Sequence, residues 1–179
     1  VVDQLQRFGY ERWFNLGDRD LAMAIHRTRL LRTGVPMHEV VAGLARDWGL
    51  TCTVLPMTNE PVPTMITGPD GELAFQEYMV KLRTELDVRS IRFAGIEAAK
   101  PGPGVIESLA DAEMVILAPS NPFVSIGPIL GVPGVRAALG TTTAVPVAIS
   151  PIIPGRAGKG PAGRLRDHGG GEDSGSGGG

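Results

Sequence analysis

The apolar run from Met114 to Ala118, which leads directly into Pro119-Ser120-Asn121-Pro122, constrains the fold more than any other stretch. Five consecutive apolar residues bounded by turn residues predict a short strand that is buried on both faces, as in the centre of a parallel sheet. A second strand, Val145–Ser150, follows a predicted helix at about Val132–Leu139. Strands that alternate with helices predict an α/β fold, with helices packed on the faces of a parallel sheet.

Turn residues and apolar spacing predict the other elements. Helices are expected over residues 1–8, after the Leu16-Gly17-Asp18 turn, over Met37–Trp48 and over Gly104–Asp111. Strands are expected at Thr51–Leu55 and Ser90–Ala94, with a hairpin over Met65–Phe75 that turns at Gly68-Pro69-Asp70-Gly71.

Composition narrows the class of protein. The chain is 42% hydrophobic with a net charge of -2, so no basic field favours nucleic acid or an anionic membrane. Its longest apolar runs are too short to cross a bilayer. Aromatic residues are scarce, so we expect a core of mainly Val, Ile, Leu and Ala. Cys52 is the single cysteine, which fits a reducing, cytoplasmic compartment.

The two ends of the chain suggest an incomplete domain. The sequence starts at Val1 without a Met and already reads as helix, so we expect the N-terminus to be a cut. The Gly-rich composition of residues 166–179 predicts a disordered tail. We therefore expect residues 1–165 to form the central part of one α/β domain that is incomplete at both ends.

Charged residues cluster where the second helix should begin. Asp18 is a candidate N-cap, and Asp20 in the first turn suits the positive end of the helix dipole. Arg19 and His26 are seven residues apart and therefore share one side of the helix, which Arg29 extends as a cationic strip. That strip could hold an anion beside the free N–H groups of the helix. Capping and ligand binding remain open as interpretations.

The predicted apolar face of this helix lies elsewhere. It is formed by Leu21, Ala24, Ile25 and Leu31, which recur at the helical period.

Two loops at predicted strand ends carry short polar side chains. Ser120, Asn121 and Ser125 follow the first strand, where ligands bind in open parallel sheets, although a plain strand–helix connection would use the same residues. Lys159 and Gly160, with Arg156, follow the second strand and could cradle a phosphate. This second loop is not a P-loop, because its glycine spacing is wrong and Gly160 replaces the metal-binding hydroxyl.

In their order, these segments resemble the 2-phospho-L-lactate transferases of coenzyme F-420 biosynthesis and their phosphoenolpyruvate-using bacterial relatives. The resemblance is carried by WFNLGDRDLA with His26 and Arg29, by Leu55-Pro56-Met57, by APSNPxxSIxPIL and by SPIIxGxAxKGPA. It runs from about Trp13 to Ala162 and implies a Rossmann-like, mostly parallel sheet.

The resemblance implies an enzyme that transfers a phospholactyl or phosphoenolpyruvyl group. A guanosine-diphosphate-activated donor would react with the deazaflavin precursor Fo, GMP would leave, and magnesium would assist. Asp18, Arg19 and Asp20 match a family segment on the deazaflavin side. Ser120, Asn121 and Ser125 match a loop near the nucleotide or phosphate, and Lys159 and Gly160 match the loop that closes over it. Family members are often homodimers, and catalytic residues are not identified.

Two departures from the family pattern stand out. The family's glycine-rich start and the acidic segment thought to hold the metal are missing, so we expect the magnesium ligands to lie upstream of this chain. The part after the KGPA loop is replaced by the Gly/Ser tail.

Two alternatives remain. One is a non-catalytic, nucleotide-sugar-binding regulator of the gluconeogenesis-factor type, although such proteins carry a Gly-Ser-Leu-Tyr-like loop where this chain has Ser-Asn-Pro. The other is an inactive fragment of the transferase.

Overall fold

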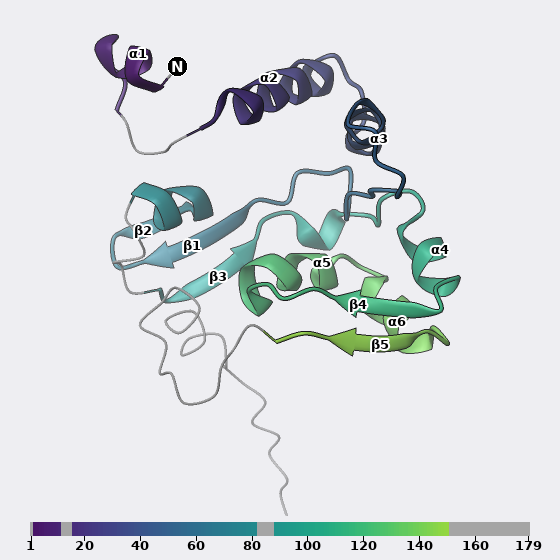
Figure 1. The fold of residues 1–179 in the computed structure, drawn as a ribbon. Helices are drawn as coiled ribbons and strands as arrows, with labels where there is room; N and C mark the ends of the chain where they lie inside the picture. Colours follow the sequence, from purple (N-terminus) through teal and green to yellow (C-terminus); the bar gives the residue numbers. More distant parts are fainter. Residues whose placement is uncertain (1, 12–15, 82–87, 151–179) are drawn as a thin grey trace, which may run out of the picture.

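The computed structural model describes residues 2–11, 16–81 and 88–150 (Figure 1). The helices are α1 (Val2–Arg7), α2 (Asp18–Arg32), α3 (Met37–Asp47), α4 (Val105–Ala110), α5 (Gly127–Gly131) and α6 (Val135–Thr141). The strands are β1 (Thr64–Gly68), β2 (Gly71–Ala74), β3 (Ser90–Phe93), β4 (Met114–Leu117) and β5 (Val145–Ala148). Shorter helical turns are η1 (Glu77–Lys81), η2 (Ile96–Ala98) and η3 (Pro122–Ile126). The predicted α/β class is confirmed.

Two sheets organise the described residues. β4 and β5 form a parallel pair, as predicted, with Met114 opposite Val145 and Leu117 opposite Ala148. β1 pairs antiparallel with both β2 and β3, so the predicted strand at Ser90–Ala94 joins this second sheet. Figure 1 shows α4, α5 and α6 gathered around the β4–β5 pair, while α2 and α3 lie above both sheets in this view.

Local turn chemistry explains the elements that were predicted correctly. The hairpin turns at Pro69-Asp70, and Gly71 adopts a positive φ of 122° that a side chain would strain. α3 begins after Pro36 and is followed by Gly49 at φ 67°, the expected order of proline before a helix and glycine after it.

The core lies mainly under the antiparallel sheet. Ile66, Tyr78 and Val88 are fully or almost fully buried there, and Phe123 and Val124 of η3 pack against them. Val132 and Val135, near α6, are also buried. Aliphatic side chains dominate the core as expected, and Tyr78 is the large exception. Because η3 packs into this cluster, it links the antiparallel sheet to the segment that follows β4.

The predicted strand at Thr51–Leu55 is wrong: this segment is irregular, and Leu50 and Val54 are exposed. A strand forms only where a neighbouring strand accepts its hydrogen bonds, and none pairs with these residues in the described part of the chain. The prediction that β4 is buried on both faces is also wrong, because Met114 and Ile116 on one face are 53% and 58% exposed.

The predicted helix at Val132–Leu139 starts later than expected. Pro133 and Gly134 interrupt it, with Gly134 at φ 92°, so that α5 ends before them and α6 begins after them. Within the described residues, no single helix is long and apolar enough to cross a membrane; only Pro122–Gly131 and Val135–Thr141 together, bent by 85°, reach that length and composition.

The connector segment, residues 55–60, joins the parts of the fold. Asn59 Oδ1 accepts a hydrogen bond from the His38 backbone N–H at 2.9 Å, which ties the connector to the start of α3. Gly102 N–H donates to the Met57 carbonyl at 2.9 Å, which ties it to the turn before α4. A Cβ on Gly102 would lie 2.3 Å from the Pro56 carbonyl oxygen, so this close approach requires glycine.

We predict that Gly102→Ala destabilises the protein by about 1–3 kcal/mol, because a methyl group would push against backbone and not against a movable side chain. Gly43→Ala is the matched control: Gly43 lies within α3 with open space around its Cβ position, and this change should stabilise by up to about 1 kcal/mol. Urea unfolding of both variants measures the difference. Equal midpoints for the two variants would contradict the close approach at Pro56.

Candidate functional site

The loop after β4 holds three predicted site residues close together in the chain and in space. Asn121 Oδ1 accepts hydrogen bonds from the backbone N–H groups of Phe123 at 2.9 Å and Val124 at 3.2 Å. Ser125 N–H donates to the Asn121 carbonyl at 3.0 Å. Ser120, Asn121 and Ser125 are all half-buried. The prediction that these residues lie in a strand–helix connection at the carboxyl end of β4 is confirmed, whereas their contact with a ligand stays a prediction.

This loop is held firmly because the next residues pack against β3. A Cβ on Gly127 would meet the Phe93 ring at 3.2 Å and the Pro122 carbonyl at 3.3 Å. The side-chain oxygen of Asn121 is already used by the turn, so this residue shapes the loop whatever else it contacts.

The first turn of α2 differs from the prediction in its cap. The N-cap is Gly17, with Asp18 as the first helical residue, so the prediction of Asp18 as N-cap is wrong. Asp20 supplies the carboxylate instead and accepts a hydrogen bond from the Gly17 N–H at 3.2 Å. A carboxylate three residues inside the helix can reach back to the N-cap in this way. The side chains of Asp18, Arg19 and Asp20 are exposed.

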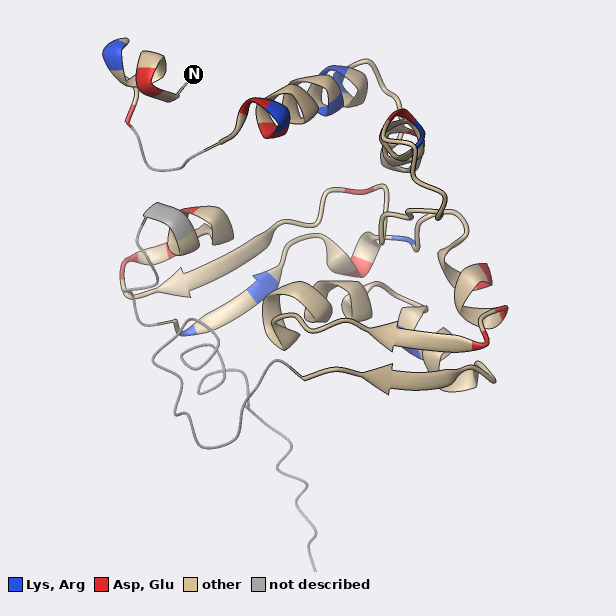
Figure 2. Ribbon diagram, viewed as in Figure 1, with Lys and Arg blue, Asp and Glu red and all other residues tan. Residues whose placement is uncertain are grey.

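The rest of the cationic strip is also exposed. His26 and Arg29 lie on the surface of α2, and Arg29 borders a shallow depression together with Ala24, Ile25, Thr28 and Arg32. Figure 2 shows this helix with cationic residues at both ends. No residue of α2 is buried, and Ile25 is 60% exposed, so the predicted apolar face does not enter the core.

The predicted site residues form two groups that Figure 1 shows apart. In this view the start of α2 lies above the antiparallel sheet, whereas the segment after β4 lies beside β3. Lys159 and Gly160 are outside the described residues. A single cleft that unites the three loops therefore stays a prediction.

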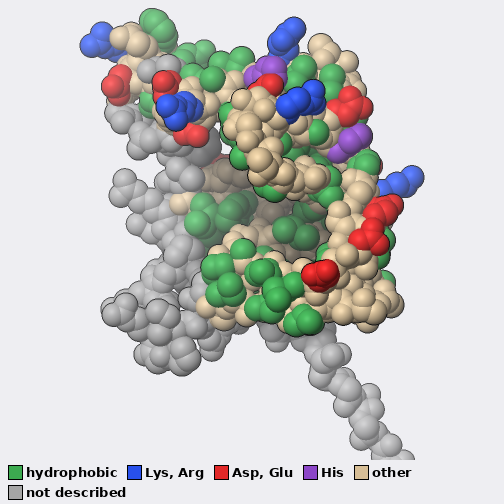
Figure 3. Space-filling model, turned by 45° about the vertical axis from the view of Figure 1, so that its right-hand side comes forward, with side chains coloured by type: hydrophobic (Ala, Val, Ile, Leu, Met, Phe, Trp, Pro, Cys, Tyr) green, Lys and Arg blue, Asp and Glu red, His purple; other side chains and the backbone are tan. Residues whose placement is uncertain are grey.

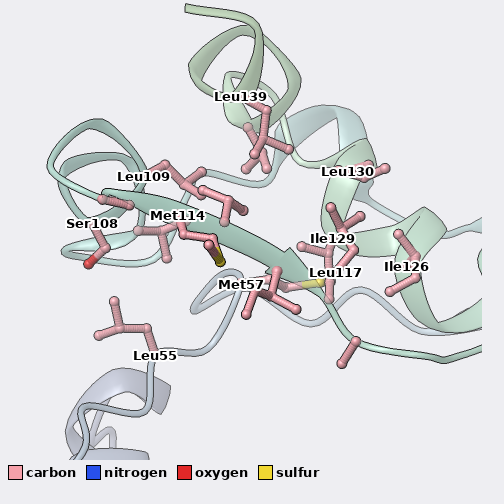
Figure 4. A pocket seen from close by; sticks show the side chains of 16 residues that line it. Leu55, Met57, Ser108, Leu109, Met114, Leu117, Ile126, Ile129, Leu130 and Leu139 are labelled. Carbon is pink, nitrogen blue, oxygen red and sulfur yellow. The ribbon is translucent and has the colours of Figure 1, made fainter. Parts of the chain in front are cut away.

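A cavity of about 570 Å³ lies beside β4, between the connector and helices α4 to α6. In Figure 4, Leu55 and Met57 approach β4 from the connector, while Leu109, Ile129, Leu130 and Leu139 lie around the strand from the helices. Figure 3 shows the corresponding hollow with hydrophobic side chains inside it. Its walls are almost entirely apolar, so they suit apolar groups and offer little to a phosphate.

Sequence reasoning did not find this cavity as a site. The only signal was the Leu55-Pro56-Met57 segment, since the other walls come from helices that are distant in sequence.

A polar cluster supports the cavity wall formed by the connector. Glu60 Oε2 accepts hydrogen bonds from the Thr58 hydroxyl and from the Lys100 backbone N–H, the latter at 3.2 Å. These hydrogen bonds lower the pKa of Glu60 below its usual 4.5. The Thr58 hydroxyl has the largest effect, and the Lys100 N–H has the next largest. Among the described residues, no group of three or more His, Cys, Asp or Glu side chains could hold a metal ion.

Comparison with known proteins identifies relatives of most of the chain. Residues 1–173 match the model of the family described as 2-phospho-L-lactate transferase CofD. A phosphoenolpyruvate transferase from Mycolicibacterium smegmatis is 44% identical over 161 residues, which cover 86% of this chain and 49% of that protein. A phosphoenolpyruvate transferase from Streptomyces griseus is 42% identical over 158 residues, which cover 86% of this chain and 50% of that protein. The chain thus spans about half the length of these curated relatives.

Solved structures show the same fold at lower sequence identity. Two crystal structures of a UPF0052-family protein from Bacillus halodurans match with TM-scores of 0.55 and 0.56 at 19% identity. The matched regions cover 80% and 83% of this chain, but only 46% and 48% of the solved chains. This likeness supports the predicted α/β class, whereas the predicted mostly parallel sheet is not seen in the described residues, where three of the five strands pair antiparallel.

The lowered pKa of Glu60 predicts a pH-dependent contribution to stability. A carboxyl whose folded pKa is depressed stabilises the fold above its unfolded pKa of about 4.5 and loses that contribution as the pH falls through the folded value. Glu60→Gln should therefore lower the unfolding temperature at pH 6, and the difference from the parent should shrink below about pH 4.5. Thermal unfolding between pH 3 and pH 6 (roughly the range over which carboxyls titrate) measures it.

Glu97→Gln, at an exposed position on η2, is the control for removing one negative charge. A parent–variant difference for Glu60→Gln that stays constant with pH would contradict the stabilising role of the Glu60 carboxylate.

Proposed function

The chain belongs to the 2-phospho-L-lactate transferase CofD family. We propose that it acts as part of a transferase in coenzyme F-420 biosynthesis. The group transferred is a phosphoenolpyruvyl or phospholactyl group, the donor is activated as a guanosine diphosphate derivative, and the acceptor is the deazaflavin precursor Fo. The single observation that carries this proposal is the family match over residues 1–173, supported by relatives whose names specify phosphoenolpyruvate transfer.

The chemistry is a substitution at phosphorus. The ribityl hydroxyl oxygen of Fo forms a bond to the phosphorus that carries the three-carbon acid, and the bond from that phosphorus to the GMP oxygen breaks. The hydroxyl proton is lost, GMP leaves with the electron pair, and a phosphodiester remains on the deazaflavin. Such a reaction depends mainly on positioning two substrates and on offsetting negative charge at the phosphates.

The loop after β4 is the proposed donor contact. Ser120 and Ser125 offer hydroxyl groups, and Asn121 offers an amide, at the carboxyl end of a parallel strand, where this class of fold binds ligands. The hydrogen bonds from Phe123 and Val124 to Asn121 hold the loop in one shape before a ligand arrives, which reduces the ordering cost of binding. Lys159 and Gly160 are proposed to close over the same phosphates.

The first turns of α2 are the proposed deazaflavin contact. Arg19 is exposed and charged, and His26 and Arg29 continue along the same helix, with Asp18 and Asp20 at its start. An exposed guanidinium can bind an anionic or carbonyl oxygen of a ring without first breaking a buried pair.

The participation of magnesium is proposed only on the basis of the family. The described residues do not fit a metal site, because they contain no group of three ligating side chains. A cytoplasmic location and a homodimer are proposed on the same family grounds.

The proposal is tested by thermal shift with Fo and with GDP, followed by mass spectrometry of the phosphodiester formed from Fo and the guanylylated donor. The Mycolicibacterium smegmatis relative serves as positive control. Stabilisation by both ligands supports the transferase. No response to either ligand would favour the inactive-fragment alternative.

Two substitutions at Asn121 separate loop shaping from ligand contact. Asn121→Ala removes both the cap and the amide, whereas Asn121→Asp keeps an acceptor for Phe123 and Val124 but puts a negative charge beside the phosphates. We expect both variants to bind GDP at least tenfold more weakly, with Fo affinity unchanged, as measured by calorimetry. An Asp variant that binds GDP like the parent would limit Asn121 to a structural role.

For the deazaflavin side, Arg19→Ala should weaken Fo binding by about 1–3 kcal/mol, the range for a hydrogen bond to a charged group. Arg46→Ala, which removes the same charge from the surface of α3, is the control and should leave Fo affinity unchanged. Calorimetry with Fo measures both. Equal Fo affinity in parent and Arg19→Ala would remove Arg19 from the site.

A further inference from the structure

The backbone of η3 is a π-helical turn, in which an N–H donates to the carbonyl five residues back instead of four. The Ile126 N–H donates to the Asn121 carbonyl at 3.1 Å. The Gly127 N–H donates to the Pro122 carbonyl. The Asn121 carbonyl also accepts the Ser125 N–H at 3.0 Å, which is the α-helical pairing. Because one carbonyl holds both kinds of bond, this turn is a single exchange of partners away from an ordinary α-helical turn.

The side chain that contacts η3 at its end is Phe93 of β3. π turns are rare and occur frequently at functional sites, so packing around η3 has to favour this form over the α-helical one. A Cβ on Gly127 would lie 3.2 Å from Cζ and 3.5 Å from Cε2 of the Phe93 ring. Gly127 has φ −50° and ψ −52°, which any residue adopts in a helix. Glycine is therefore needed here for the space that the ring occupies and not for its backbone freedom.

β3 is a fixed support for this ring. Backbone hydrogen bonds of 2.8 Å and 3.0 Å join Arg89 and Ala94, the residues on either side of β3, to β1 and to the residue before it. Side chains alternate along a strand, so Phe93 shares a face with Ile91, which packs against the buried core cluster. The position of the ring is thus set by the core.

We propose that Phe93 is a positioning residue for the loop after β4: its ring fixes Gly127, and thereby holds η3 in the π turn. An α-helical turn would transfer the Gly127 N–H from the Pro122 carbonyl to the Phe123 carbonyl. Contact with the ring at Gly127 determines which of the two carbonyls this N–H reaches.

The form of the turn decides how the polar side chains stand relative to one another. Ser125 lies inside η3, whereas Ser120 and Asn121 lie before it, so a change of turn moves one hydroxyl relative to the other two side chains. This inference rests on the proposed function, in which all three contact the donor. A donor site that is already arranged binds without a further ordering cost, so loss of the arrangement weakens binding.

Phe93→Leu tests the role of the ring, because it removes the atoms nearest Gly127 and keeps an apolar side chain on β3. We expect GDP to bind roughly tenfold more weakly or worse, with Fo affinity unchanged, as measured by calorimetry. Arg92→Ala is the matched control: it lies on the same strand but on the opposite face, where Arg92 pairs with Glu72 at 2.8 Å. This variant should bind GDP like the parent.

Gly127→Ala in two backgrounds isolates the contact. In the parent the added methyl meets the ring and should weaken GDP binding roughly tenfold, whereas in Phe93→Leu it should cost less than about threefold, because the ring atoms are gone. The methyl lies 3.3 Å from the Pro122 carbonyl in both backgrounds, so that contact cancels. Gly131→Ala is the control: its methyl would meet Ile96 at 3.0 Å, and its effect should be equal in both backgrounds.

A ligand-free measurement separates this inference from the proposed function. In the parent, NMR should detect a through-hydrogen-bond coupling between the Gly127 nitrogen and the Pro122 carbonyl carbon. In Phe93→Leu this coupling should be replaced by one to the Phe123 carbonyl carbon. If the parent does not bind GDP, the donor part of the proposed function fails, and the coupling alone decides whether Phe93 sets the turn.

The inference is overturned if Phe93→Leu keeps the coupling to Pro122 and the GDP affinity of the parent, even when urea unfolding shows a loss of stability. Equal effects of Gly127→Ala in the two backgrounds would overturn it as well. If Phe93→Leu does not fold, Gly127→Ala in the parent disturbs the same contact from the other side, and retention of the Pro122 coupling there counts against the inference.

Discussion

The hydrogen bonds of the connector tie the start of α3 and the turn before α4 to one short segment. Asn59 reaches the start of α3, the Met57 carbonyl receives the Gly102 N–H, and Glu60 receives the Lys100 N–H. Each contact is modest in energy, but the three act on one short segment. If the connector moved, one wall of the cavity beside β4 would move with it. The position of this wall therefore depends on these hydrogen bonds as well as on apolar packing.

The polar and apolar parts of the candidate site share η3, because Ile126 lines the cavity and its N–H donates to the Asn121 carbonyl at 3.1 Å. The Ser120–Ser125 loop is anchored on the core through Phe123 and Val124, and its shape follows from the Asn121 side chain. The cavity beside β4 is bounded by the connector and α4 to α6. A change in η3 would therefore alter both, although a phosphate and an apolar group make opposite chemical demands on their surroundings.

Features set by neighbouring residues could be predicted from the sequence, whereas features set by distant residues could not. The hairpin at Pro69-Asp70 and the limits of α3 follow from local turn chemistry. Thr51–Leu55 has a strand-like sequence, but pairing depends on a partner that lies elsewhere. The cap of α2 was misplaced by one residue because Gly17 and Asp18 are both acceptable caps, and only the Asp20 contact decides between them. The cavity could not be predicted from the sequence, because it forms only where the connector packs near three helices that are distant from it in the chain.

Pro146 has a consequence for how far assembly can proceed. A flat sheet with two receptive edges can recruit one molecule after another, which is the geometry of fibrils. Pro146 lies opposite Val115, so its nitrogen faces away from β4, and the outer edge of β5 has one backbone donor fewer. Edge-to-edge pairing with another molecule is therefore less favourable at this position of β5, which is one of the ways in which natural sheets limit aggregation.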